Sequence, residues 1–338
     1  MDFFDINLPV AGIEINVLVF LLIGFSSGVM GGFFGMGGGW MITPTLYIFG
    51  FRMAHAVATG ISYIPGMFLF ASLRHRRMGN VDGKLAGFLI ASTVVGLECG
   101  TRVMAMLDEA NRAGPVISVV YVVFLTALGA FITYDFFKHR RARKAGAAAH
   151  VPGITRFFRK VKLPPVIHFK TAGIDCSFWV IFLTGAAVGF LAGIMGVGGG
   201  IFCMPALIYV IGCPTVVAVG TVVLSTMVSA TYGLLKYAAM GKVEIFATVF
   251  MLAGATVGAQ LGASAVRYVR GYSIRILLAV GIFSAVASLV LKQSGLEAVS
   301  GVFILAAVAA VTFIVLVFFV RGMRRETGRS TPGGRAAP

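Results

Sequence analysis

The chain has 338 residues, of which 58% are hydrophobic and only 12% charged, and its mean hydropathy is +0.95. Water-soluble domains carry about 25% charged residues, so this composition excludes a soluble domain and indicates an integral membrane protein. The net charge of +16 does not indicate nucleic-acid binding, because ten of the 28 Lys and Arg residues lie between Lys138 and Lys170. Such basic clusters are typical of cytoplasmic segments beside the lipid bilayer.

The apolar runs are long, which predicts helices rather than the alternating strands of a membrane barrel. We expect an all-α polytopic membrane protein with about 10–11 membrane segments. In chain order these segments lie at 16–36, 40–51, 54–73, 85–107, 115–137, 177–196, 200–212, 215–235, 243–266, 273–291 and 298–320. The expected organisation is a membrane repeat (14–137), a basic cytoplasmic linker (138–170), a second membrane repeat (171–292), an extra membrane helix (297–321) and a basic cytoplasmic tail (322–338).

Two stretches of the chain resemble each other. The sequence GVMGGFFGMGGG at 28–39 aligns with GFLAGIMGVGGG at 189–200, and all six identical positions are glycine. Farther on, MGNVD at 78–82 matches MGKVE at 240–244. We interpret these matches as an internal duplication, which is typical of secondary transporters.

The distribution of basic residues favours inverted over parallel repeats. Inverted repeats place eight basic residues of the second half on the cytoplasmic side, whereas parallel repeats place three there. The first set is Arg267, Arg270, Arg275 and the five arginines within 321–335, and the second is Lys236, Lys242 and Lys292. By the positive-inside rule we expect an inner (plasma) membrane protein with its N-terminus outside and its C-terminus in the cytoplasm.

Gly37, Gly38 and Gly39 are consecutive, and three glycines in a row predict a break in the helix. Such a break is tolerated at membrane depth only where protein or a water-filled cavity surrounds it. It exposes backbone N–H groups at the start of the next half-helix, and these groups bind anions. The alternative is close helix packing, which fits Gly28 and Gly32. A phosphate loop is disfavoured, because no Lys follows at the required spacing.

The paired G-x-G-G-G-x-x-x-x-P units, each followed by M-G-x-V-[DE], resemble the TauE/SafE sulfite-exporter family over about residues 15–292. The motif falls on Gly35, Gly37, Gly38, Gly39 and Pro44, and again on Gly196, Gly198, Gly199, Gly200 and Pro205. The resemblance implies an inner-membrane carrier of a small anion, with sulfite or an organosulfonate as the favoured substrate. We expect alternating access around a site at the two glycine breaks.

Hydroxyl side chains cluster at corresponding depths of the two repeats. They are Thr59, Ser62 and Tyr63 in the first repeat and Thr221, Ser225 and Thr226 in the second. We interpret them as hydrogen-bond donors that line the substrate path. Neutral donors suit this place because a desolvated Lys or Arg is costly inside a membrane. The alternative is that these hydroxyls bond to carbonyls of their own helix. Pro65 is expected to kink the first of these helices.

Glu98 is the one acidic residue well inside an apolar run, and Arg102 lies on the same helix face. One interpretation is an ion pair near the outer membrane interface. The other is a proton-coupling carboxylate.

The histidines and carboxylates show no spacing of metal ligands, so we expect neither a metal nor a cofactor. The expected partners are the small anion and the lipid bilayer, and the oligomeric state stays open. An enzyme is disfavoured because catalysis needs several titratable side chains in one place, and Glu98 is the one candidate. An anion channel, a carrier of a non-sulfur organic anion and a structural membrane protein stay as alternatives.

Overall fold

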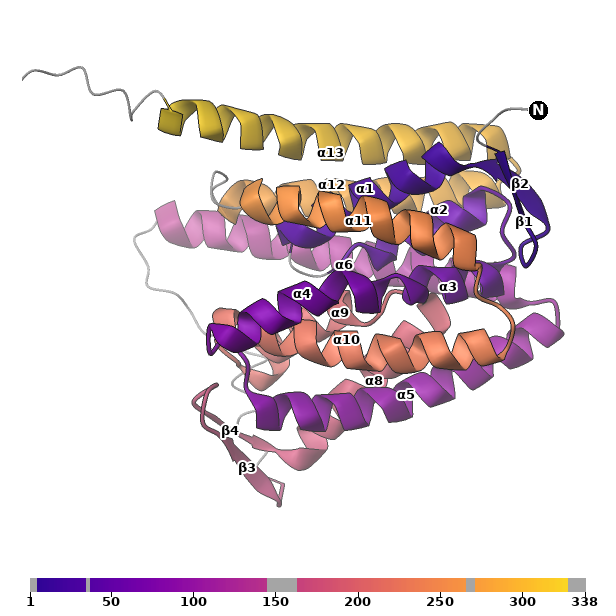
Figure 1. The fold of residues 1–338 in the computed structure, drawn as a ribbon. Helices are drawn as coiled ribbons and strands as arrows, with labels where there is room; N and C mark the ends of the chain where they lie inside the picture. Colours follow the sequence, from indigo (N-terminus) through magenta and orange to yellow (C-terminus); the bar gives the residue numbers. More distant parts are fainter. Residues whose placement is uncertain (1–4, 35–36, 145–162, 266–270, 328–338) are drawn as a thin grey trace, which may run out of the picture.

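The computed structural model describes residues 5–34, 37–144, 163–265 and 271–327 (Figure 1). Among the described residues, nine helical spans are long and apolar enough to cross a membrane, if α3 and α4 below are counted together as one span, Met53–Arg77. The prediction of an all-α polytopic membrane protein is therefore confirmed. In the first half the helices are α1 (Val17–Phe34), α2 (Gly39–Ile48), α3 (Met53–Ser62), α4 (Ile64–Arg77), α5 (Gly83–Glu109) and α6 (Ala113–Lys144). In the second half they are α8 (Phe178–Met195), α9 (Gly200–Pro205), the π-helix η1 (Ala206–Ile211), α10 (Thr215–Ala239), α11 (Ile245–Ala265), α12 (Gly271–Gln293) and α13 (Glu297–Thr327).

Two of the expected membrane segments are too short to cross a bilayer. The segment expected at 40–51 is the ten-residue helix α2, and the segment expected at 200–212 is α9 followed by η1. Each follows a long helix after a glycine interruption, so each pair forms a broken helix as predicted. The helix expected at 54–73 is also interrupted, because α3 ends at Ser62 and α4 begins with Pro65 in its first turn.

The sequence analysis missed two β-hairpins. Strand β1 (Asp5–Leu8) pairs with β2 (Ile13–Asn16), and β3 (Val166–Phe169) pairs with β4 (Ile174–Ser177). The two hairpins lie at opposite ends of the helix bundle, each directly before a long helix (Figure 1). Leu8 and Phe169 are fully buried, so each hairpin inserts an apolar side chain into the bundle.

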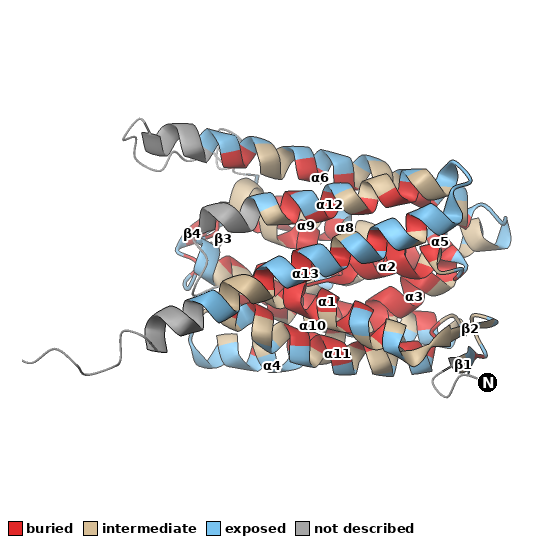
Figure 2. Cartoon of the chain, turned by 90° about the horizontal axis from the view of Figure 1, so that it is seen from above, coloured by how far each residue is buried: buried red, intermediate tan, exposed pale blue. Residues whose placement is uncertain are grey.

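Small residues bring the two halves into close contact. Helix α1 packs along α11, and α8 packs along α5. A Cβ atom on Gly28 would overlap the Ala255 backbone, and one on Gly258 would overlap the backbone of Phe25. The close helix packing that the sequence suggested for Gly28 is therefore present, and Gly258 packs in the same way. Figure 2 shows buried residues gathered on central helices such as α1 and α2, while α6 and α13 expose one face.

We predict that Gly96→Ala destabilises the fold, because the new Cβ would overlap the Ala186 backbone where α8 crosses α5. Overpacking of this kind lowers the free energy of unfolding by about 1–3 kcal/mol. Gly87→Ala is the matched control on the same helix, since no atom lies within 4 Å of its Cβ position. Thermal melting of both variants in detergent checks this, and equal melting temperatures would contradict the packing of α5 on α8.

Candidate functional site

The helix interruptions lie at the predicted glycines. Helix α1 ends at Phe34, and α2 begins after Gly37, whose φ is +74°. The second interruption contains Gly196, Gly198 and Gly199, with φ values of +69°, +67° and +81°. Residues with a side chain rarely adopt these angles, which explains the glycines at these positions. Gly35 lies outside the described residues.

The two interruptions touch each other. A Cβ atom on Gly39 would lie 3.1 Å from both the Cα and the carbonyl oxygen of Val197. A Cβ on Gly38 would overlap Ser27, and one on Gly196 would overlap the Val57 backbone. Glycine is therefore required at these positions for packing, and at Gly196, whose φ is +69°, for backbone conformation as well. The two broken helices meet inside the bundle, where all of these residues are buried.

The carbonyl groups at the end of α8 have hydrogen-bond donors, whereas the N–H groups at the start of the short helices have no side-chain cap. The hydroxyl of Tyr237 donates to the Gly193 carbonyl at 2.6 Å, and that of Tyr121 donates to the Met195 carbonyl. No side chain caps the helix that follows Gly38 or the one that follows Gly199. The N–H groups of Met41 and Phe202 already bond to the carbonyls of Gly38 and Gly199, so the donors that this interface offers are the N–H groups before them.

A small pocket of about 10 Å³, the room of about one water molecule, lies beside the second interruption. Four of the predicted site residues line it, namely Gly198, Gly199, Ser225 and Thr226. The hydroxyl residues Thr93 and Ser229 also line it and were missed by the sequence analysis. Ser229 follows Ser225 by one helical turn, so helical spacing was the signal that could have found it.

Most hydroxyl groups of the pocket bond to their own helix. Ser225 donates to the Val222 carbonyl at 3.1 Å, Ser229 to the Ser225 carbonyl at 2.9 Å, and Thr93 to a carbonyl one turn earlier at 2.6 Å. The sequence analysis gave bonding of hydroxyls to carbonyls of their own helix as the alternative to substrate binding, and these three hydroxyls do bond in that way. Thr226 differs, because its hydroxyl makes no hydrogen bond to any residue that the structure describes, and its oxygen is open to the pocket rather than buried.

The other predicted hydroxyls lie away from this pocket. The Thr59 hydroxyl oxygen accepts a hydrogen bond from the Glu244 N–H at 3.1 Å. Ser62 donates to the Thr59 carbonyl at 2.8 Å, and the Tyr63 hydroxyl lies 2.9 Å from the Ser27 hydroxyl. Their role in substrate binding stays a prediction.

Comparison with known proteins identifies the family. A family model described as "Sulfite exporter TauE/SafE" matches residues 20–289. The chain belongs to the TauE/SafE family. A "Probable membrane transporter protein" of Xylella fastidiosa (strain 9a5c) is 33% identical over 246 residues, covering 71% of this chain and 80% of the relative. The "Probable membrane transporter protein YunE" of Bacillus subtilis (strain 168) is 24% identical over 257 residues, covering 74% and 88%.

These matches make the chain a multi-pass membrane transporter. No solved structure gives a significant match. The geometry of this TauE/SafE chain therefore comes from its own structure alone.

In this TauE/SafE chain, the acidic residues of the two M-G-x-V-[DE] motifs hold the hairpins in place. The Glu244 carboxylate accepts hydrogen bonds from the N–H groups of Val10 and Ala11, at 2.9 and 3.2 Å. The Asp82 carboxylate accepts from Thr171 and Ala172, at 3.0 and 3.1 Å. Both acids are buried. The motif was visible in the sequence, but this role was not.

Glu98 belongs to an ion-pair cluster that joins α5 to α10. One carboxylate oxygen lies 2.7 Å from Arg102 Nε and 2.8 Å from Lys236 Nζ, and the other accepts from the Tyr232 hydroxyl at 2.7 Å. The sequence predicted the Arg102 contact but neither of the two partners on α10. A role for Glu98 in proton coupling stays a prediction.

We predict that Glu98→Gln lowers the free energy of unfolding by about 1 kcal/mol, because it removes the ion pair between Glu98 and Lys236. Arg102→Gln is the control and is expected to change it by less than about 0.5 kcal/mol, since the Arg102 side chain is 68% exposed. Thermal melting measures both variants.

The pH profile of transport tests the proton-coupling role of Glu98. Glu98→Gln abolishes a pH-dependent step of transport if the carboxylate carries the proton, and an unchanged profile contradicts that role.

Proposed function

We propose that the protein is a secondary transporter that exports a small anion, with sulfite or an organosulfonate as the favoured substrate. The observation that carries this proposal is the contact between the two glycine interruptions, where Gly39 lies against Val197. Two carbonyl groups at the end of α8, those of Gly193 and Met195, accept from Tyr237 and Tyr121, while the start of each short helix has no side-chain cap. Such a site favours an anion over a cation.

The neutral character of the site supports a weakly held anion. No Lys, Arg, Asp, Glu or His is among the described residues that line the pocket. Hydroxyl and backbone donors bind an anion without the desolvation cost of a buried cation, and they release it readily. Cys203 is the one titratable side chain among the described lining residues, so the pocket holds no convergent acid–base set, and this gives an enzymatic function less support.

We propose that the two halves are inverted repeats and that access alternates between them. Two reciprocal hydrogen bonds support this, because Thr59 accepts from the Glu244 N–H and Thr221 accepts from the Asp82 N–H, both at 3.1 Å. Each acid also holds a hairpin, and the hairpins lie at opposite ends of the bundle (Figure 1). Opposite ends are expected for inverted repeats and not for parallel repeats.

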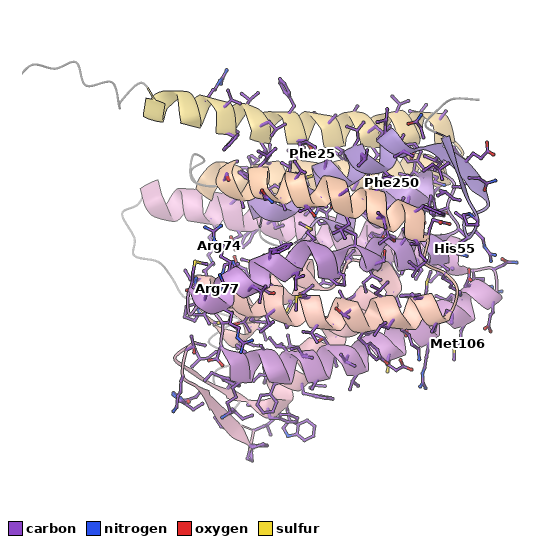
Figure 3. All side chains as sticks on the ribbon, viewed as in Figure 1. Phe25, His55, Arg74, Arg77, Met106 and Phe250 are labelled. Carbon is purple, nitrogen blue, oxygen red and sulfur yellow. The ribbon has the colours of Figure 1, made fainter. Side chains whose placement is uncertain are left out.

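We propose that the N-terminus lies outside and the C-terminus in the cytoplasm of the inner membrane. Arg74 and Arg77 lie at one end of the bundle, and His55 and Met106 lie at the other (Figure 3). The C-terminal end of α13 shares the end that holds the arginines, which fits the positive-inside rule (Figure 1). A reporter that is active only in the cytoplasm, fused after Pro338, is expected to be active, and an inactive fusion on stably produced protein would contradict this orientation.

An anion screen in proteoliposomes tests the proposed substrate class. Purified protein is expected to move sulfite or a sulfonate faster than acetate or succinate, and empty liposomes give the background. Faster movement of a carboxylate would instead assign a carrier of a non-sulfur organic anion. No flux of any tested anion would contradict anion transport.

A further inference from the structure

Each short helix lies along one long helix of the other half of the chain. A Cβ atom on Gly281 of α12 would lie 3.2 Å from the Trp40 ring at the start of α2. In the other pair, the Phe124 ring of α6 packs edge-on against the Phe202 ring of α9, with 4.4 Å between the ring centroids. The start of each short helix, beside its interruption, therefore rests on α12 or on α6.

A charged side chain of α12 holds the far end of α2. The Lys292 ammonium group donates a hydrogen bond to the Tyr47 carbonyl, and it lies 4.0 Å from the centroid of the Tyr47 ring. Tyr47 is in the last turn of α2, where the helix dipole favours a cation. The attraction between an ammonium group and the face of an aromatic ring adds to this hydrogen bond. Lys292 therefore holds the end of α2 through the backbone and the side chain of the same residue.

A charged side chain of α6 holds the far end of the second short segment. The Tyr209 hydroxyl of η1 donates to the Asp135 carboxylate at 3.0 Å, and the Tyr209 ring packs edge-on against Phe131 with 5.0 Å between the centroids. Asp135 is only 9% exposed, and an ionisable group inside a membrane helix is costly and usually functional. The two pairs share one order of contacts. A ring contact comes first, near the interruption, and a contact between a tyrosine and a charged side chain follows.

The two charged contacts lie at opposite ends of the bundle. The C-terminal ends of α6 and α13 share one end of the bundle (Figure 1). Asp135 lies in the part of α6 that approaches this end. Lys292 lies in the last turn of α12, shortly before α13 begins at the other end. Each short helix is thus fixed by the other half of the chain, and at a different end of the bundle.

We propose that Lys292 and Asp135 are positioning residues of transport. Each fixes the far end of one short helix and, through that helix, the interruption that borders the proposed anion site. Because α2 and α9 begin at the interruptions, a tilt of either short helix moves the N–H groups at its start. This inference rests on the proposed anion transport and adds the residues that hold its site in shape.

Sulfite transport by Lys292 variants tests the first contact. Lys292→Met keeps the length of the side chain but loses its charge and its donor. It is expected to lower Vmax/KM for sulfite about tenfold in proteoliposomes, because small displacements of the groups in a site are costly. Lys292→Arg keeps a cation that can donate, and it is expected to stay within about threefold of the wild type. Gln293→Met is the matched control, since Gln293 is the exposed neighbour on the same helix, and a change below about twofold is expected.

Tryptophan fluorescence follows the position of α2 without any substrate. In a Trp179→Phe background Trp40 is the one tryptophan of the chain, and its side chain is only 1% exposed. Lys292→Met is expected to raise the acrylamide quenching of Trp40 at least about twofold below the melting temperature, because the end of α2 loosens locally. Lys292→Arg and Gln293→Met are expected to leave the quenching unchanged.

Transport by Tyr209→Phe tests the second contact. This variant keeps the ring that packs on Phe131 but removes the hydroxyl that bonds to Asp135, and it is expected to lower Vmax/KM for sulfite about tenfold. Tyr134→Phe is the matched control, because Tyr134 is 65% exposed on α6.

The outcomes separate this proposal from the proposed function. Wild-type transport by Lys292→Met or by Tyr209→Phe would overturn the role of that contact and leave anion transport standing. No flux of sulfite, thiosulfate or methanesulfonate with the wild type would overturn the proposed function instead. The quenching of Trp40 would then still decide whether Lys292 positions α2, and equal quenching in Lys292→Met and the wild type would overturn that role.

Discussion

Proteoliposomes that carry Gly199→Ala are expected to move sulfite at least about tenfold more slowly than the wild type. Gly199 has a φ of +81°, which costs an alanine about 1–2 kcal/mol. Its new Cβ would also lie 3.2 Å from a methyl group of Val188, so the pocket wall has to move. Both effects act on the backbone that borders the proposed anion site, and initial flux rates at equal protein density measure them.

Gly50→Ala is the control for backbone strain. Gly50 has a φ of +99° and no atom within 4 Å of its Cβ position, and it lies in the loop between α2 and α3. This variant is strained in the same way but is expected to keep most of its flux. Equal losses in both variants would show that general strain is responsible, and the special role of the second interruption would then be wrong.

Replacing Glu244 by alanine is expected to lower the free energy of unfolding by about 3–5 kcal/mol, the largest stability loss that we predict. The buried carboxylate accepts from the N–H groups of Val10 and Ala11, and the substitution leaves both without a partner. The N-terminal hairpin is then expected to detach from the bundle. Protease sensitivity of the first 16 residues and thermal melting measure this directly.

Two further variants test whether the stability loss comes from the hydrogen bonds of the Glu244 carboxylate. Glu244→Gln keeps one acceptor oxygen and is expected to lose only about 1–3 kcal/mol. Asp175→Ala removes a hairpin carboxylate that is paired with His168 at the surface, and it is expected to cost less than about 1 kcal/mol. If Glu244→Ala melts at the same temperature as Asp175→Ala, the carboxylate does not hold the hairpin.

Hydropathy alone was enough to predict the long helices, because a bilayer requires about 20 apolar residues for each crossing. The packing role of Gly28 and the interruption at Gly37–Gly39 also follow from the local sequence, since small residues and consecutive glycines have few other uses in a membrane helix. The hairpins could not be predicted. Their strands have four residues each, and the carboxylate that holds the first turn lies 234 residues away from Val10.

The candidate site was predictable only in part. Gly199 and Thr226 were found because the glycine motif and the hydroxyl cluster are local patterns. The partner of Glu98 on α10 was not found, because Lys236 lies 138 residues away and only the fold brings the two together.

Counterflow of radiolabelled sulfite into proteoliposomes tests the central claim most directly. A carrier that alternates access around one anion site takes up labelled sulfite faster when unlabelled sulfite is present inside, and its uptake saturates. We predict both behaviours for the wild type and their loss in Gly199→Ala. Uptake that rises linearly with concentration and ignores internal sulfite would show a channel, and no uptake above that of empty liposomes would contradict sulfite transport.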